Sequence, residues 1–139
     1  MALAGDPLVE ALASALGAQT FRVADEHRVA YHASAAIAAN HLVALLGQAE
    51  RVAGGAGVPT EAIMSLAEGA LAGAARVGTA EALTGPVARG DWPTVAAHLA
   101  ALAPDERPAY EALARQALRL AWPTIRAATD EGSAPPWRS

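Results

Sequence analysis

Two polar residues inside a long apolar stretch could carry out acid–base chemistry. His32 and Asn40 stand eight positions apart with Ala36 midway, so a helix would place all three along one stripe. A histidine can donate or accept a proton near neutral pH, and an asparagine can orient a substrate oxygen. The alternative is that both are buried polar groups whose partners are neighbouring backbone or a second subunit. Spacing alone leaves both interpretations open.

A second candidate is the glycine-bounded segment TGPVARGD at residues 84–91. It leads into the start of a helix, where the Arg89 guanidinium and free backbone amides could converge on one oxyanion. The alternative is structural: Arg89 and Asp91 pair to lock the loop, and Asp91 merely caps the helix. Local physical chemistry favours this second interpretation.

Other chemistries lack their residues in this chain. Without cysteine there is no thiolate nucleophile, disulfide or thiolate metal ligand. The histidines have no partner at ligand spacing, so no metal site is expected. The serines lack a nucleophile elbow, and no G-x-G-x-x-G follows a strand, which excludes a dinucleotide fingerprint. These histidines and serines are His27, His32, His41, His98, Ser14, Ser34 and Ser65.

The composition favours a soluble helical protein. Alanine, the strongest helix former, occurs 39 times among 139 residues, whereas lysine is absent. The net charge is −4 and the ten positive charges are arginines spread along the chain, so nucleic acid is not an expected partner. The first residues have no basic region followed by a long apolar core, so no secretory signal is expected. The predicted location is the cytoplasm.

The longest predicted helix runs from about Asp25 to Ala53. It carries no formal charge over the 21 residues 29–49, which is long enough to cross a membrane. Six polar uncharged side chains interrupt this run, and alanine is more frequent in it than leucine, so we expect no membrane partner. A helix that is uncharged all round but polar at particular points is typical of the buried centre of a bundle or of a subunit interface.

Shorter helices are expected on both sides of this one, begun by capping residues and ended by glycines. They run over about residues 6–17, 59–78, 79–83, 91–102 and from 105 onward. Pro123 is expected to kink or interrupt the last helix. Residues 20–23 are the one short run with strand character, and one strand cannot form a sheet. The predicted fold class is therefore all-α, a multi-helix bundle around one long apolar central helix.

Two blocks of the sequence resemble a known family. They are AYHASAAIAANHLVALL at residues 30–46 and LTGPVARGD at residues 83–91. They resemble the C-terminal domain of unknown function of Rossmann-like, NAD(P)-dependent oxidoreductases. That domain is similar to the dimerising helical C-terminal domain of 6-phosphogluconate dehydrogenase. The resemblance covers roughly residues 6–120 and implies the same helical fold.

The resemblance also implies a division of the chain. Residues 1–23 look like the residual edge of a missing Rossmann domain, a helix followed by an extended segment. Residues 24–129 would form the helical dimerisation and substrate domain, and residues 130–139 a flexible tail. No residue of this chain is expected to bind a cofactor, and NAD(P) is expected only with the missing N-terminal domain.

The same resemblance assigns roles to the candidate residues. His32 and Asn40 would face the cleft as the catalytic acid–base group and the orienting group. Arg89, Asp91 and Tyr31 would bind the substrate, for which a small anionic molecule is the expected class. Related hydroxyacid dehydrogenases carry a catalytic lysine four residues before the asparagine. That position is Ala36 here, so His32 is the substitute proton donor.

The expected function is therefore that of a C-terminal dimerisation and substrate-binding domain of an NAD(P)-dependent oxidoreductase, without its nucleotide-binding half. Such a chain forms a homodimer and is not redox-active alone. Two alternatives remain open at this point. One is a standalone small-ligand-binding or cofactor-free catalytic domain that uses the same cleft. The other is a purely structural dimer module.

Overall fold

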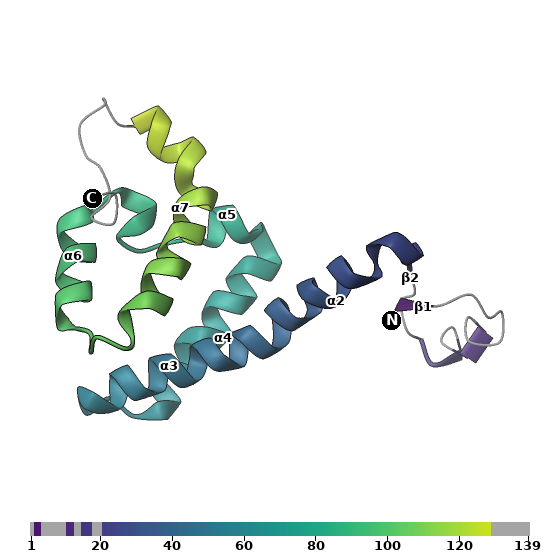
Figure 1. Cartoon of the computed structure of the whole chain (residues 1–139), viewed down its shortest axis with the longest axis horizontal. Coiled ribbons are helices and arrows are strands. Elements are labelled where there is room, and N and C mark those ends of the chain that lie inside the picture. The colour runs from purple at the N-terminus through teal and green to yellow at the C-terminus, as the bar shows by residue number, and fades with distance from the viewer. Residues whose placement is uncertain (1, 4–10, 13–14, 18–20, 129–139) are drawn as a thin grey trace. The chain divides into compact units, whose positions relative to one another are not determined.

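A computed structural model describes residues 2–3, 11–12, 15–17 and 21–128, and these are mostly helical, as predicted (Figure 1). The predicted helix start at residues 6–7 and the predicted tail at 130–139 lie outside the described residues. The chain divides into two compact units, residues 1–45 and 46–139, which are described separately. The elements of the first unit are β1 (Ala2–Leu3), β2 (Phe21–Arg22), η1 (Asp25–His27), α2 (Arg28–Ala36) and η2 (Ile37–His41).

The first unit contains a pair of parallel strands that the sequence analysis missed. β1 pairs with β2 in the register Ala2 with Phe21 and Leu3 with Arg22. The strand expected at residues 20–23 is thus paired and not alone. Parallel strands must be joined by a crossover connection, usually helical, and residues 11–12 between them are helical. With two residues each, these strands have no alternation that a sequence could show.

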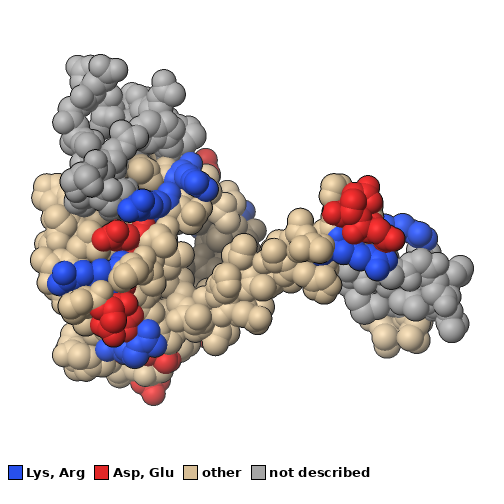
Figure 2. Space-filling model, in the orientation of Figure 1, with Lys and Arg blue, Asp and Glu red and all other residues tan. Residues whose placement is uncertain are grey.

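The long helix predicted from Asp25 is present and extends to Gly55, through η1, α2, η2 and α3 (Leu42–Gly55). None of residues 25–45 is buried, so the prediction of a buried bundle centre is wrong for the first unit by itself. By length and composition this is the one described helix that could cross a membrane. Figure 2 shows no blue or red side chain on the visible face of the stretch that follows Arg28.

The second unit holds the end of α3 and the remaining helices. Gly57 and Gly78 adopt positive φ angles of 72° and 89° beside helix ends, a conformation that glycine reaches without steric cost. Pro123 does not interrupt the last helix, contrary to one of the two expectations for it. The elements are α4 (Thr60–Val77), α5 (Thr79–Ala82), η3 (Val87–Arg89), α6 (Trp92–Ala101) and α7 (Arg107–Ala128).

A small core joins η3, α6 and α7 of the second unit. Its buried members are Val87, Trp92, Val95 and Ala114, and Val95 is fully inaccessible. At the edge of this core the Tyr110 hydroxyl and His98 Nδ1 share a hydrogen bond of 2.8 Å, which also links α6 to α7. Because alanine contributes little buried area, a few larger side chains carry most of the packing energy.

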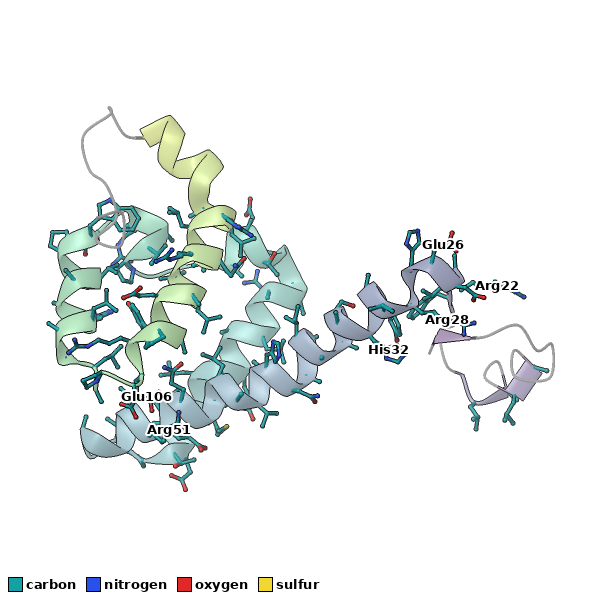
Figure 3. The ribbon with its side chains drawn as sticks, in the orientation of Figure 1. Arg22, Glu26, Arg28, His32, Arg51 and Glu106 are labelled. Carbon is teal, nitrogen blue, oxygen red and sulfur yellow. The ribbon has the colours of Figure 1, made fainter. Side chains whose placement is uncertain are left out.

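A polar clamp ties the end of α3 to the turn between α6 and α7. Arg51 makes a bidentate ion pair with Glu106, with Nε to Oε1 at 2.7 Å and an NH2 contact to Oε2 at 3.2 Å (Figure 3). The Gln48 side-chain amide donates to the Glu106 carbonyl at 2.8 Å. The pKa of Glu106 is held below its usual range, first by the hydrogen bond from Arg51. The clamp therefore fixes the position of the α6–α7 turn on α3.

Replacing the central core residue tests this account of the packing. We expect Val95→Ala to lower the free energy of unfolding by about 2 kcal/mol, because it removes two buried methyl groups and leaves a cavity. Denaturant unfolding of the whole chain measures this. The matched control is Val77→Ala at a 40% exposed position, with an expected cost of less than about 0.7 kcal/mol. Equal losses in the two variants would contradict the assignment of the core.

Candidate functional site

The predicted site residues fall into two groups that the structure places in different units. Tyr31, His32 and Asn40 belong to the first unit, whereas Arg89 and Asp91 belong to the second. Each group is therefore considered in its own surroundings.

Tyr31 is held in place by an aromatic contact from the strand pair. Its ring meets that of Phe21 on β2 edge to face, with centroids 5.6 Å apart, and is half-buried. The His32 ring lies 5.8 Å from the Tyr31 ring and is exposed (Figure 3). Among the described residues, no hydrogen bond occupies either nitrogen of His32. The exposed His32 ring is therefore accessible to a ligand.

Asn40 lies in a π-helical turn, η2, which the sequence analysis did not anticipate. In an α-helix Asn40 would lead His32 by about 80° around the axis, since 3.6 residues make a turn. A π turn closes i→i+5 hydrogen bonds and rotates less per residue, so Asn40 moves back toward the line of His32. The two side chains are still up to about 12 Å apart along the axis. They could contact different groups of one ligand but not the same reacting atom.

The loop before α6 is held by its own hydrogen bonds. Gly90 takes a left-handed conformation with φ 67°, and the Asp91 N–H donates back to the Pro86 carbonyl at 2.9 Å. Asp91 then caps α6, since its carboxylate accepts from the Thr94 N–H at 3.2 Å and from the Thr94 hydroxyl at 2.8 Å. The hydrogen bond from the Thr94 hydroxyl is the main reason that the pKa of Asp91 lies below its ordinary value of 3.8.

These bonds engage the backbone donors at the start of α6 that were expected to bind an oxyanion beside Arg89. The amides of Arg89, Gly90, Asp91, Trp92, Thr94 and Val95 all donate within the loop and the first turn of α6. Pro93 has no amide hydrogen. The amides at the start of α6 are therefore not free for the predicted convergence with the Arg89 guanidinium on one anion. The capping role of Asp91 is confirmed, and the exposed Arg89 guanidinium is the group left for an anionic ligand.

The sequence analysis also missed the clamp formed by Gln48, Arg51 and Glu106. Its two charged partners lie 55 residues apart, and no spacing rule connects them. Beside the clamp lies an open pocket of about 560 Å³. In the described part of the chain, no group of three or more His, Asp or Glu side chains could hold a metal ion.

The fold and these sites define a mostly helical protein with a small parallel strand pair at its N-terminal end. Residues 3–117 match the family model for a domain of unknown function, DUF2520. The match covers most of the chain, so the protein belongs to this family. Neither the curated proteins nor the solved structures contain a match to the chain.

Removing the cap tests the role of Asp91. We expect Asp91→Ala to lower the melting temperature at pH 7 by about 3 °C, because two hydrogen bonds at the start of α6 are lost. The matched variant Asp91→Asn keeps an acceptor oxygen and should lose less.

The same cap predicts a pH dependence. Folding lowers the pKa of Asp91, so its stabilisation is complete above the unfolded-state value and disappears as pH falls through the folded-state value. The difference in melting temperature between wild type and Asp91→Ala should stay constant down to about pH 4 and then close. Circular dichroism melts from pH 7 to pH 2 measure this. A difference that grows on acidification would contradict the capping role.

Proposed function

We propose that this chain is the C-terminal dimerisation and substrate-binding domain of an NAD(P)-dependent oxidoreductase, with a fold like that of 6-phosphogluconate dehydrogenase C-terminal domains. The nucleotide-binding domain is not among its residues, since the sequence has no dinucleotide fingerprint. The proposal has one main structural support in the first unit and a second in the long helix.

The main support is the parallel pairing of β1 with β2. Parallel strands occur almost only in larger sheets covered on both faces by helices, and two strands alone are marginally stable in water. The described residues contain only these two strands, with two residues in each. They fit the edge of a larger parallel sheet, such as the sheet of a nucleotide-binding α/β domain.

The second support is the uncharged helix, whose apolar side chains need a cover. Val29, Ile37 and Val43 are 81%, 59% and 68% exposed, and no residue from 29 to 45 carries a formal charge. A large exposed apolar surface of this kind marks an interaction site. A second copy of the chain, packed along this helix, would cover it without placing a charge out of water. This is the homodimer of the proposal.

The candidate residues take specific roles in this proposal. His32 exchanges a proton with the substrate, and Asn40 holds a substrate oxygen further along the same helix. Tyr31 packs beside His32 and contributes a hydroxyl group. Arg89 binds an anionic group of the substrate through its guanidinium alone. Asp91 contributes by holding the Arg89 loop on α6, which replaces the direct contact expected from the sequence.

The dimer can be tested by placing a charge on the uncharged helix. We expect the wild-type chain to be a dimer at micromolar concentration, and Val43→Arg to weaken it roughly 100-fold, because an unpaired charge would be buried in the interface. Leu71→Arg, at a 63% exposed position on α4, is the control and should leave the dimer unchanged. Sedimentation equilibrium measures both. A monomeric wild type, or one that partitions into lipid vesicles, would contradict the proposal.

The proposal assigns nucleotide binding to another domain, and this leads to a separate prediction. The chain alone should give no saturable heat when titrated with NADPH or NADH up to about 1 mM, because it has no glycine-rich phosphate loop. Tight binding in isothermal titration calorimetry would show that the nucleotide site is in this chain. The genomic reading frame upstream of Met1 is the companion observation. A strand followed by G-x-G-x-x-G supports the proposal, and an in-frame stop codon close to Met1 argues against it.

A further inference from the structure

One face of the uncharged helix has the same order of side-chain types when it is read from either end. Ala36 stands at the middle, His32 and Asn40 stand four positions before and after it, and Val29 and Val43 stand seven positions before and after it. The order is apolar, polar, small, polar, apolar in both directions. These five residues, named here the central face, all belong to the first unit.

Helix geometry places these residues on one side of the axis. Successive α-helical residues turn by about 100°, so Val29 and His32 lie within about 40° of Ala36. The π turn rotates less per residue, which brings Asn40 toward the line of His32 and moves Val43 toward one edge of the face. His32 and Asn40 are exposed, and Val29 and Val43 are 81% and 68% exposed.

The described strand pair does not cover the central face. β2 meets the helix through Phe21, whose ring contacts the Tyr31 ring. Tyr31 stands five positions before Ala36 and so points about 140° away from it around the helix axis. The strand pair therefore contacts another side of the helix. Within the described part of the first unit, the central face is open to a partner.

A second copy of the helix that crosses this one in the opposite direction at Ala36 fits the face. Alanine at the crossing point lets the two axes approach to about 8 Å, the short end of the usual range. In a two-fold contact each pairing occurs twice, because residue i of one copy meets residue j of the other and the reverse. Each His32 then lies beside Asn40 of the partner subunit, and each Val29 lies near Val43 of the partner subunit.

The polar groups of the face favour this occupant and this direction. An apolar partner or a lipid chain would cover the Asn40 amide without offering it a hydrogen bond, which costs free energy. A parallel second copy would bring the two His32 rings together, and these repel when both carry a proton. In the antiparallel contact each imidazole faces an amide, which can both donate and accept. The nearest charged groups of the helix, Arg28 and Asp25, pair with each other at 2.8 Å outside the crossing.

We propose that two copies pack antiparallel across Ala36 and form two identical polar sites, each made of His32 from one copy and Asn40 of the partner subunit. Within one chain these two side chains are up to about 12 Å apart along the axis and cannot act on the same atom. Across the contact they are neighbours, so the imidazole can exchange a proton with a substrate oxygen that the partner's Asn40 holds. This inference rests on the homodimer of the proposed function, and a single chain holds neither site complete.

Disulfide crosslinking tests the direction of packing, because the chain has no cysteine of its own. His32→Cys and Asn40→Cys chains are mixed, with one of them ¹⁵N-labelled so that mass spectrometry distinguishes the products, and are oxidised with copper phenanthroline. We expect the disulfide between unlike chains to form at least about tenfold faster than a disulfide between identical chains. In the antiparallel contact the thiols of identical chains are separated by about 12 Å along the axis, too far for a disulfide.

A second pair of variants tests the choice of face and keeps both polar residues in place. Ala36→Cys should crosslink with itself, because the two copies cross at this residue. Ser34→Cys points about 160° away from Ala36 and is the matched control, expected to crosslink at least about tenfold more slowly. Circular dichroism checks that each variant keeps its helical content.

The outcomes separate this inference from the proposal on which it rests. A chain that sediments as a monomer at micromolar concentration would remove the homodimer itself, and this inference with it. In a chain that sediments as a dimer, three results would overturn the inference alone. They are equally fast crosslinking of identical and unlike chains in the mixture, no crosslinking of Ala36→Cys, and equally fast crosslinking of Ser34→Cys and Ala36→Cys.

Discussion

The structure depends on how the long helix from Asp25 to Gly55 is covered. Its first half has no charged side chain after Arg28, and within the first unit none of its apolar residues is buried. Its second half is fixed differently, because Arg51 and Gln48 bind the α6–α7 turn through Glu106. At one end of this helix the polar side chains have hydrogen-bond partners. At the other end the apolar side chains are exposed within the first unit. A cover for that surface is the main physical requirement that the first unit by itself leaves unmet.

Local sequence signals predicted the helices and several of their ends. Asp91 caps α6 and Gly78 ends α4, because capping and left-handed glycine depend on residues within one turn. The pairing of β1 with β2 and the bond between Arg51 and Glu106 could not be found this way. Each joins segments far apart in the chain, and two-residue strands or single ion pairs leave no periodic pattern. The π turn at Asn40 also has no glycine or proline to mark it.

The candidate site shows a different limit of sequence reasoning. The TGPVARGD segment has the glycines and the arginine of an anion-binding loop, and its amides could in principle be free. Whether they are free depends on the turn that the loop adopts. Here the turn directs the amides of residues 89–92, 94 and 95 to Pro86, Val87, Gly90 and Asp91. The capping role favoured for Asp91 from the sequence is confirmed by its hydrogen bonds to Thr94.

The same abundance of alanine that favours helices also explains where open space remains in the second unit. Alanine side chains cover little surface and fill little volume. Larger residues such as Val95 and Trp92 fill the space between helices in the core, whereas a pocket remains where several small residues meet. The polar groups that remain without an internal partner then stand out. His32 on the uncharged helix is one such group, and within the first unit it lies on a helix with exposed apolar side chains. A charged or proton-exchanging group next to exposed apolar surface is the arrangement that a binding site needs. We therefore place the proposed proton exchange on the uncharged helix, where the first unit by itself leaves apolar side chains exposed.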